Sequence, residues 1–285
     1  MNKKLAALLL TGALTLLSGC GTRQTVDPHE GMINVNTGGN TEWLYPADGV
    51  AVSDFAPADF ALDESGRVTY TGADYAAETG IDVSFYQGDI DWQAVRDSGV
   101  TFAMIRCGFR GSSQGGIFDD EKFTANMEGA IAAGLKVGVY FFSQSTGAKE
   151  AAEEALYVLD KIKDYQVTMP VAFDWEPLDD SRAQDINVDE LTSAAAVFCE
   201  IVKDAGYEPC VYFYRYLAYH DYDLSALGGY TFWVGAPGDV PDFYYAHSIW
   251  QYSFTGAVPG ITGDVDLNLH FTRLTETTST PAPSA

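Results

Sequence analysis

Two acidic side chains placed two residues apart are the sharpest chemical signal in the sequence. Asp174 and Glu176 lie in the stretch PVAFDWEP, where an apolar run leads directly into the pair. On a β-strand both carboxyls would point to the same face, with Cα atoms roughly 6.5 to 7 Å apart. Crowding and burial hold a proton on one carboxyl, which places an acid beside a base. The pattern predicts acid–base catalysis, and the alternative is a solvent-facing strand end whose acids do no chemistry.

Two further acids occupy strand-like positions. Asp82 lies in GIDVSFYQG and Asp266 in DVDLN, and apolar residues alternate around both. We expect both side chains to point into the same interior as the first pair. Asp91, in contrast, is typical of a helix N-cap and is left out of the site.

Other reaction classes lack their motifs. The four histidines show no HxxxH or HxH spacing, so we expect no metal centre. Ser84, Ser143 and the cysteines have no adjacent base in a recognisable nucleophile turn, which disfavours a serine or cysteine hydrolase. No glycine-rich phosphate loop follows a strand, and we expect no cofactor.

Aromatic residues are plentiful near the predicted strand ends. Flat rings stack on sugar faces while their polar tips form hydrogen bonds, so the set favours a sugar-binding cleft, although core packing is the alternative for each member. The candidate substrate-binding residues are Tyr140, Phe142, Tyr212, Tyr214, Trp233, Trp250 and Tyr252.

Strand and helix patterns alternate from about Gly80, which predicts parallel strands joined by right-handed crossovers. Strands are expected from Ile81, Thr101, Leu135, Pro170 and Pro209, and helices over 91–98, 120–133, 148–164 and 188–205. After Arg215 three more strand-like runs follow, with one weak helical pattern at 216–227. We predict an α/β fold, an irregular TIM-like barrel with five β/α units followed by three β-strands. An open doubly wound sheet is the alternative.

The first twenty residues, MNKKLAALLLTGALTLLSGC, have the layout of an export signal. The ending LSGC resembles a bacterial lipoprotein box, which implies lipidation of Cys20 and a lipid anchor to the membrane. An ordinary signal peptide cut nearby is the alternative. The domains we predict are a signal peptide at 1–19, a flexible tether with a short hairpin near 60–70 at 20–78, the catalytic barrel at 79–273 and a polar tail at 274–285.

The charge balance restricts the partners. With 16 Lys and Arg against 40 Asp and Glu, the formal net charge is −24, which repels phosphate backbones, and we expect no nucleic-acid partner. We expect a monomer. Among the cysteines, Cys199 and Cys210 are compatible with a disulfide bridge, while three buried thiols including Cys107 are the alternative.

Seven segments of the sequence, taken in order, resemble those of one known family. The succession GIDVSFYQGDIDW, FAMIRCGFRG, KVGVYFFSQ, PVAFDWEP, VYFYRYLAY, IWQYS and DVDLN resembles family 25 of the glycoside hydrolases, the Chalaropsis-type lysozymes. The resemblance covers about Gly80 to Phe271 and includes all four acids. One departure is Tyr140-Phe141, where many relatives carry a Tyr-His pair.

The resemblance implies cleavage of the β-1,4 bond after N-acetylmuramic acid in peptidoglycan outside the cytoplasm. It implies that Glu176 is the acid/base, that Asp174 is its close partner, and that Asp82 and Asp266 are the other carboxylates of the cleft. Two alternatives stay open: a glycan-binding barrel without turnover, and a hydrolase of chitin-like N-acetylglucosamine polymers.

Overall fold

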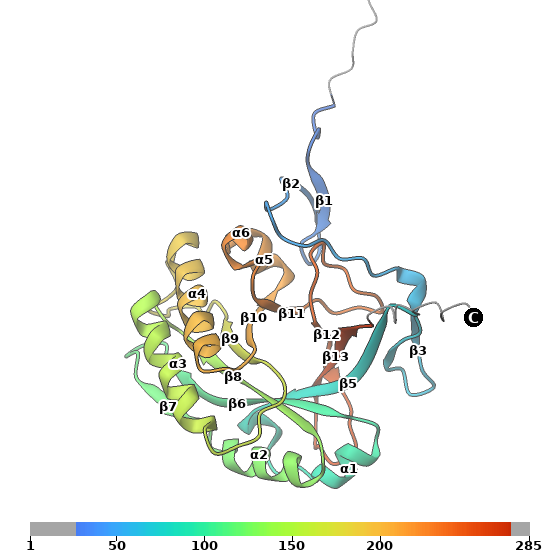
Figure 1. Cartoon of the computed structure of the whole chain (residues 1–285), viewed down its shortest axis with the longest axis vertical. Helices are drawn as coiled ribbons and strands as arrows, with labels where there is room; N and C mark the ends of the chain where they lie inside the picture. The colour runs from blue at the N-terminus through green and yellow to red at the C-terminus, as the bar shows by residue number, and fades with distance from the viewer. Residues whose placement is uncertain (1–26, 275–285) are drawn as a thin grey trace, which may run out of the picture.

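Strands and helices alternate over the central part of the chain and close into a barrel (Figure 1). The structure is a computed structural model that describes residues 27–274. The strand order is β5-β13-β12-β11-β10-β9-β8-β6, and a further pairing of β5 with β6 closes the ring. The strands are β5 (Tyr75–Val83), β6 (Phe102–Arg110), β8 (Lys136–Ser143), β9 (Val171–Trp175), β10 (Pro209–Tyr214), β11 (Thr231–Gly235), β12 (Ile249–Gly256) and β13 (Val265–Arg273).

Helical segments follow the first five barrel strands. They are α1 (Trp92–Asp97), α2 (Phe123–Ala132), α3 (Ala148–Ile162), α4 (Val188–Asp204), and the short pair α5 (Arg215–His220) and α6 (Leu224–Leu227). The prediction of five β/α units followed by three strands is confirmed, and closure by β5 and β6 excludes the open sheet. The weak helical pattern at 216–227 corresponds to α5 and α6. A short strand, β7 (Ile117–Asp119), pairs with the end of β6 and was not predicted.

Strand direction changes at the end of the chain. The pairs from β5–β6 round to β11–β12 are parallel, whereas β13 runs antiparallel to both of its neighbours. The start of β13 therefore lies at the same rim as the carboxyl ends of the parallel strands. This reversal brings an acid near the beginning of β13 to the open end of the barrel.

Local sequence explains where the helices begin and end. The Asp91 side chain accepts a hydrogen bond from the Ala94 amide and caps α1, as predicted. Gly134 and Gly206 have φ of 80° and 87°, and they follow α2 and α4 in the left-handed conformation that glycine adopts without strain. Among residues 27–274, none of the helices is long and apolar enough to cross a membrane.

Alternation along the strands separates two apolar layers. One set of side chains fills the barrel interior and includes Phe102, Met104, Tyr212 and Trp233. The opposite faces pack against the helices, as Phe173 of β9 does against Phe198 of α4, with ring centroids 5.4 Å apart. The barrel is thus filled below its open end, and a cavity forms only at the rim.

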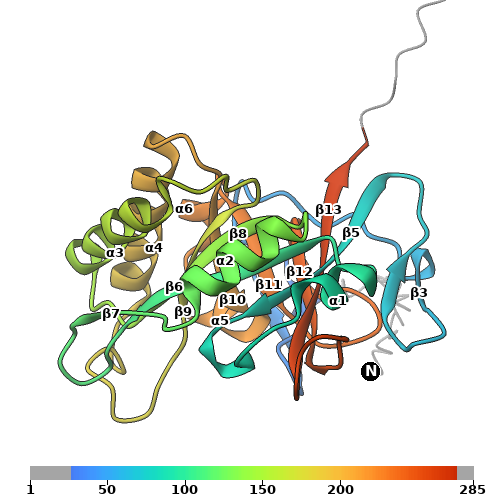
Figure 2. The same ribbon diagram turned by 90° about the horizontal axis from the view of Figure 1, so that it is seen from below.

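Residues 27–78 differ from the flexible tether that we expected. They contain the predicted hairpin, β3 (Phe60–Leu62) with β4 (Val68–Tyr70), and a second one, β1 (Ile33–Asn36) with β2 (Thr41–Leu44). A 3-10 turn (Pro57–Asp59) precedes β3. Figures 1 and 2 show the β3–β4 hairpin beside β5 and β13, on the side of the barrel that lacks helices.

Aromatic rings fix this segment to the barrel. The Phe60 ring lies 5.6 Å from Trp250 and 6.0 Å from Phe271, and Phe55 lies 4.5 Å from Phe271. Val52 forms a β-bridge with Tyr245. The segment therefore covers strands that would otherwise expose apolar faces. The predicted signal peptide, Cys20 and residues 275–285 lie outside the described residues.

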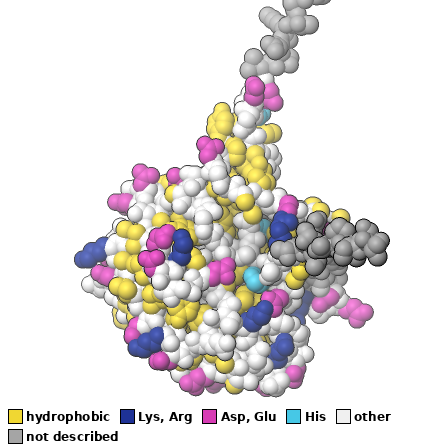
Figure 3. All heavy atoms as spheres, viewed as in Figure 1, with side chains coloured by type: hydrophobic (Ala, Val, Ile, Leu, Met, Phe, Trp, Pro, Cys, Tyr) yellow, Lys and Arg dark blue, Asp and Glu magenta, His cyan; other side chains and the backbone are white. Residues whose placement is uncertain are grey.

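Figure 3 shows acidic side chains scattered over one face among fewer basic ones, with apolar side chains gathered on the projecting N-terminal hairpin. Exposed aromatics of this hairpin include Trp43. Cys107, Cys199 and Cys210 are buried free thiols, so the structure favours the thiol alternative over a bridge.

Candidate active site

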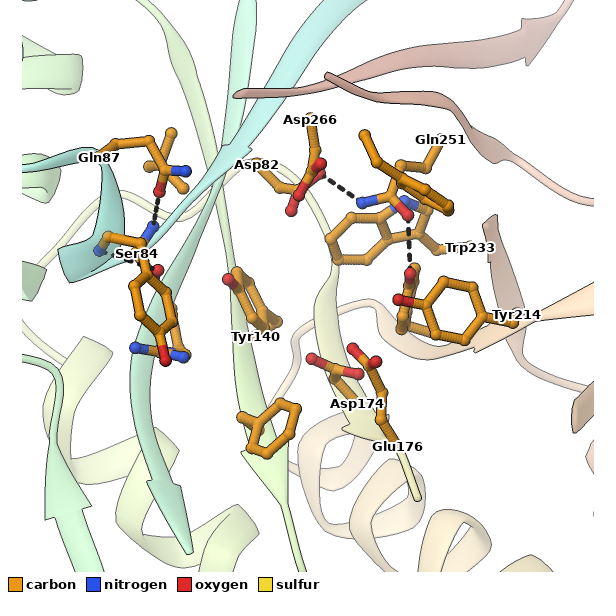
Figure 4. Close-up of a pocket in the computed structure, with 16 residues that line it drawn as sticks. Asp82, Ser84, Gln87, Tyr140, Asp174, Glu176, Tyr214, Trp233, Gln251 and Asp266 are labelled. Atoms are coloured by element: carbon orange, nitrogen blue, oxygen red, sulfur yellow. Dashed lines mark hydrogen bonds between the residues drawn. The ribbon is translucent and has the colours of Figure 1, made fainter. Parts of the chain in front are cut away.

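The end of β9 delivers the first pair of acids. Ala172 and Asp174 face the barrel interior while Phe173 and Trp175 face outwards, because successive side chains alternate. Asp174 is 3% exposed and Glu176, just past the strand, is half-buried. Both line one cavity of about 330 Å³, and Figure 4 shows them side by side. The structure thus brings the two carboxyls together as their spacing predicts.

Asp82 and Asp266 meet because β13 is antiparallel to β5. Asp82 is the penultimate residue of β5 and Asp266 the second residue of β13, and the two are direct partners in the register. They lie across the cavity from Asp174 and Glu176 (Figure 4). All four predicted acids therefore line the same cavity.

Amide side chains hold Asp82 as an acceptor. Its Oδ2 accepts hydrogen bonds from Gln251 Nε2 at 2.9 Å and from Asn268 Nδ2 at 2.7 Å. The orientation of Gln251 is fixed in turn, because Tyr212 donates its hydroxyl to Gln251 Oε1 at 2.7 Å. Two donors to one oxygen stabilise the ionised form. Asp82 is thus the carboxyl best prepared to carry negative charge, although burial raises its pKa.

Burial raises the pKa of the other three carboxyls as well. The pKa of Asp266 rises to about 9, first through desolvation and then through the nearby Asp82. Desolvation also raises the pKa of Asp174 well above its ordinary value, and the charge of Glu176 adds to the effect. The pKa of Glu176 is raised by desolvation, an effect opposed by the Tyr214 hydroxyl and reinforced by Asp82. At neutral pH the cavity therefore retains a proton on Asp266, and it disfavours ionisation of the other carboxyls.

One positive side chain lines the cavity. Arg106 is 7% exposed, and its Nε donates to Asp120 Oδ2 at 2.8 Å. The guanidinium lies over the rings of Phe85 and Tyr86, 5.1 and 5.4 Å from their centroids. The charge of Arg106 lowers the pKa of Asp174, but desolvation outweighs this effect. Four acids of the cavity thus face one cation, which is already paired with Asp120.

Aromatic walls surround the acids as predicted for Tyr140, Phe142, Tyr212, Tyr214 and Trp233, which all line the cavity. The Tyr212 and Trp233 rings pack edge to face with centroids 4.6 Å apart. Such a lining is partly apolar and partly hydrogen-bonding, as a site for a sugar must be.

Trp250 and Tyr252 do not line the cavity, which corrects the expectation for both. On β12 it is Gln251, between them, that points into the barrel, so its neighbours point outwards. Trp250 donates its indole N–H to the Ala236 carbonyl and packs on Phe60. These two rings belong to the layer that binds the N-terminal segment.

Several residues of the site were not predicted from the sequence. Asn268 donates to Asp82 without lining the cavity itself, and it lies two residues after Asp266, so strand alternation was the available signal for it. The unpredicted residues that line the cavity come from loops and strands without a distinctive local pattern, namely Val83, Ser84, Tyr86, Gln87, Arg106, Gln251 and Phe254.

The carboxyl groups of the site suit acid–base chemistry. Over residues 27–274 no group of three or more His, Cys, Asp or Glu is arranged to hold a metal ion. The Asp174 Oδ1 atom is buried and has no hydrogen-bond partner within this part of the chain. A protonated carboxyl, an ionised carboxylate and an unpaired acceptor in one cavity can donate a proton and stabilise developing positive charge.

Comparisons with known proteins identify the family of the chain. The sequence profile of Glycosyl hydrolases family 25 matches residues 81–261. The chain is 28% identical over 208 residues to lysozyme M1 of Streptomyces globisporus, covering 69% of this chain and 68% of that protein. It is 29% identical over 190 residues to the autolytic lysozyme of Clostridium acetobutylicum, covering 66% of this chain and 54% of the relative, so the match spans about half of that protein's length.

A solved structure has the same fold. The bacterial lysozyme from Streptomyces coelicolor aligns with a TM-score of 0.55 and 25% identity, over 68% of this chain and 91% of that one. The family profile covers well over half of the chain, from the strand that carries Asp82 to the loop after β12. The chain belongs to glycosyl hydrolase family 25.

Proposed function

We propose that the protein is a muramidase that hydrolyses the β-1,4 bond between N-acetylmuramic acid and N-acetylglucosamine in bacterial peptidoglycan. Membership of the family and similarity to proteins named lysozymes support the class of reaction. The observation that carries the proposal is the placement of Asp174 and Glu176 side by side in a cavity that raises the pKa of both.

In the proposed mechanism Glu176 donates a proton to the glycosidic oxygen as the bond breaks. Its raised pKa favours retention of that proton, and its partial exposure leaves it within reach of substrate. The oxocarbenium-like centre that develops is stabilised by the negative charge of the cavity, to which Asp82 contributes most readily. After the leaving group departs, ionised Glu176 activates the incoming water.

Asp174 has one of two roles in this mechanism. It attacks the anomeric carbon directly, or it orients the 2-acetamido group of the substrate, which then attacks. Both roles require its carboxyl to lie beside Glu176 in the cavity, where the structure places it. Retained anomeric configuration is expected in both cases.

The product of a digestion tests the proposal. Purified peptidoglycan is incubated with the protein, the products are reduced with borohydride, and mass spectrometry identifies the new reducing ends. We expect N-acetylmuramic acid at these ends. New N-acetylglucosamine ends, or cleavage of chitin oligomers alone, would make it a different glycosidase. Tight binding without any new ends would make it a glycan-binding barrel.

We also propose that the mature protein is an exported monomer attached to the bacterial membrane by a lipid on Cys20. The LSGC sequence supports the lipid, and a wall substrate would lie outside the cytoplasm. Labelled fatty acid should be incorporated in a bacterial host, and Cys20→Ala should abolish both the label and membrane attachment. Label retained by Cys20→Ala would contradict the attachment site, and size-exclusion chromatography tests the monomer.

A further inference from the structure

A second hollow continues the catalytic cavity on the side of Glu176. It has a volume of about 550 Å³ and shares Tyr214 and Phe254 with the catalytic cavity. Pro177, the residue after Glu176, forms part of its lining. The two hollows are therefore neighbouring compartments of one cleft.

The walls of this second hollow have the chemistry of a sugar subsite. Tyr216 is 49% exposed and Phe254 38% exposed, and the rings of Pro177 and Pro237 add further apolar surface. Exposed aromatic faces that flank a cleft are covered favourably by the apolar face of a pyranose ring. Arg215 also lines the hollow and supplies a polar side chain at its edge.

One wall comes from the N-terminal hairpin rather than from the barrel. Thr37 and Gly38, at the turn between β1 and β2, line the hollow. These residues precede the stretch matched by the family profile, which begins at residue 81. This wall is thus an addition to the catalytic barrel.

Hydrogen bonds hold the turn in place. Asp242 Oδ2 accepts from Asn36 Nδ2 at 2.6 Å and from Arg215 Nη1 at 3.2 Å, which joins the hairpin to the start of α5. Thr37 is buried and donates its hydroxyl to Glu42 across the hairpin at 2.9 Å. A wall that is ordered before substrate arrives costs little entropy on binding.

We infer that the hairpin turn, Tyr216 and Phe254 form an additional subsite for sugar rings of the same β-1,4-linked N-acetylhexosamine strand that occupies the catalytic cavity. The inference depends on the proposed function. Continuity of the two hollows through Tyr214 and Phe254 identifies the occupant as the continuing polymer. The subsite makes the enzyme favour long glycan strands over short ones.

Steady-state kinetics on strands of different length test the inference. Tyr216→Ala removes a ring that is half exposed, and Asp242→Ala releases the turn without touching the cavity. For each variant we expect KM on long strands to rise about fivefold, with kcat unchanged and little effect on a tetrasaccharide. Tyr45→Ala removes a ring that is 72% exposed on the same N-terminal segment but outside both hollows, and it should behave as wild type.

Each outcome separates the inference from the proposed function. If wild type cleaves peptidoglycan and both variants keep the wild-type preference for long strands, the inference is overturned and the function stands. If wild type cleaves nothing, the proposed function fails. In that case the subsite is tested by binding alone: calorimetry measures the affinity of long strands for Glu176→Gln protein with and without Tyr216→Ala. Weaker binding by the double variant supports the subsite, and equal affinities overturn it.

Discussion

Asp266→Asn should stabilise the protein, and the gain should grow with pH. The folded protein raises the pKa of Asp266 from 3.8 to about 9, mainly because the side chain is desolvated beside Asp82. In the unfolded chain the carboxyl ionises at its ordinary pKa. Above that pKa the unfolded state has released a proton that the folded state retains, so wild-type stability falls as pH rises towards 9. Asparagine cannot ionise, and its amide can still donate to Asp82.

The magnitude follows from the size of the shift. Each pKa unit corresponds to 1.36 kcal/mol, and pH 7 lies about three units above the ordinary pKa of 3.8 at which the unfolded chain ionises. The largest stabilisation that Asp266→Asn could give at pH 7 is therefore about 4 kcal/mol. The side chain is partly exposed, and screening by water reduces the expected gain to about 2 kcal/mol. For a protein of this size the melting temperature should rise by roughly 4 to 8 °C.

Urea unfolding of both proteins at several pH values measures this effect. The difference in unfolding free energy should be near zero at about pH 4 and should increase to about pH 9. Asp204→Asn, at the exposed end of α4, controls for the loss of one negative charge far from the cavity. A difference that is independent of pH, or an Asp266→Asn protein less stable at pH 7, would show that folding does not raise the pKa of Asp266.

Two other substitutions test the site and the N-terminal segment. Asp82→Asn removes a charge that raises the pKa of Glu176, so the alkaline limb of the profile of kcat/KM against pH should move to lower pH by about one unit. An alkaline limb that stays in place or moves to higher pH contradicts this coupling. Phe60→Ala removes a ring that packs on Trp250 and Phe271, and it should lower the unfolding free energy by about 3 to 5 kcal/mol. Leu62→Ala, 52% exposed on the same strand, is its control, and equal effects of the two would exclude a packed segment.

The barrel was predictable because its signals are local. Each of the first five strands is an apolar run followed by a helical pattern, and Gly134 and Gly206 mark where helices end. The packing of residues 27–78 was not predictable in the same way. Strands β3 and β4 have three residues each, and Phe60 finds its partners at positions 250 and 271. Short strands whose partners are distant in sequence carry no readable periodicity.

The acids of the site were predictable from alternation, which assigns Asp174 to an inward face. The seven aromatic candidates rest on residue type rather than on strand face, and on β12 this selects Trp250 and Tyr252 wrongly. Gln251 occupies the inward position there, and its neighbours Trp250 and Tyr252 therefore point away from the cavity. The meeting of Asp82 with Asp266 depends on the reversed direction of β13, which only the assembled sheet defines.

Release of reducing ends from purified peptidoglycan by Glu176→Gln protein measures how far hydrolysis depends on the proton that Glu176 donates. We expect a rate reduced by about a hundredfold or more, because glutamine cannot donate the proton, with a melting temperature at or above that of wild type. Glu128→Gln, an exposed acid on α2, should keep the wild-type rate. A folded Glu176→Gln protein that releases reducing ends at the wild-type rate would contradict the assignment of the acid.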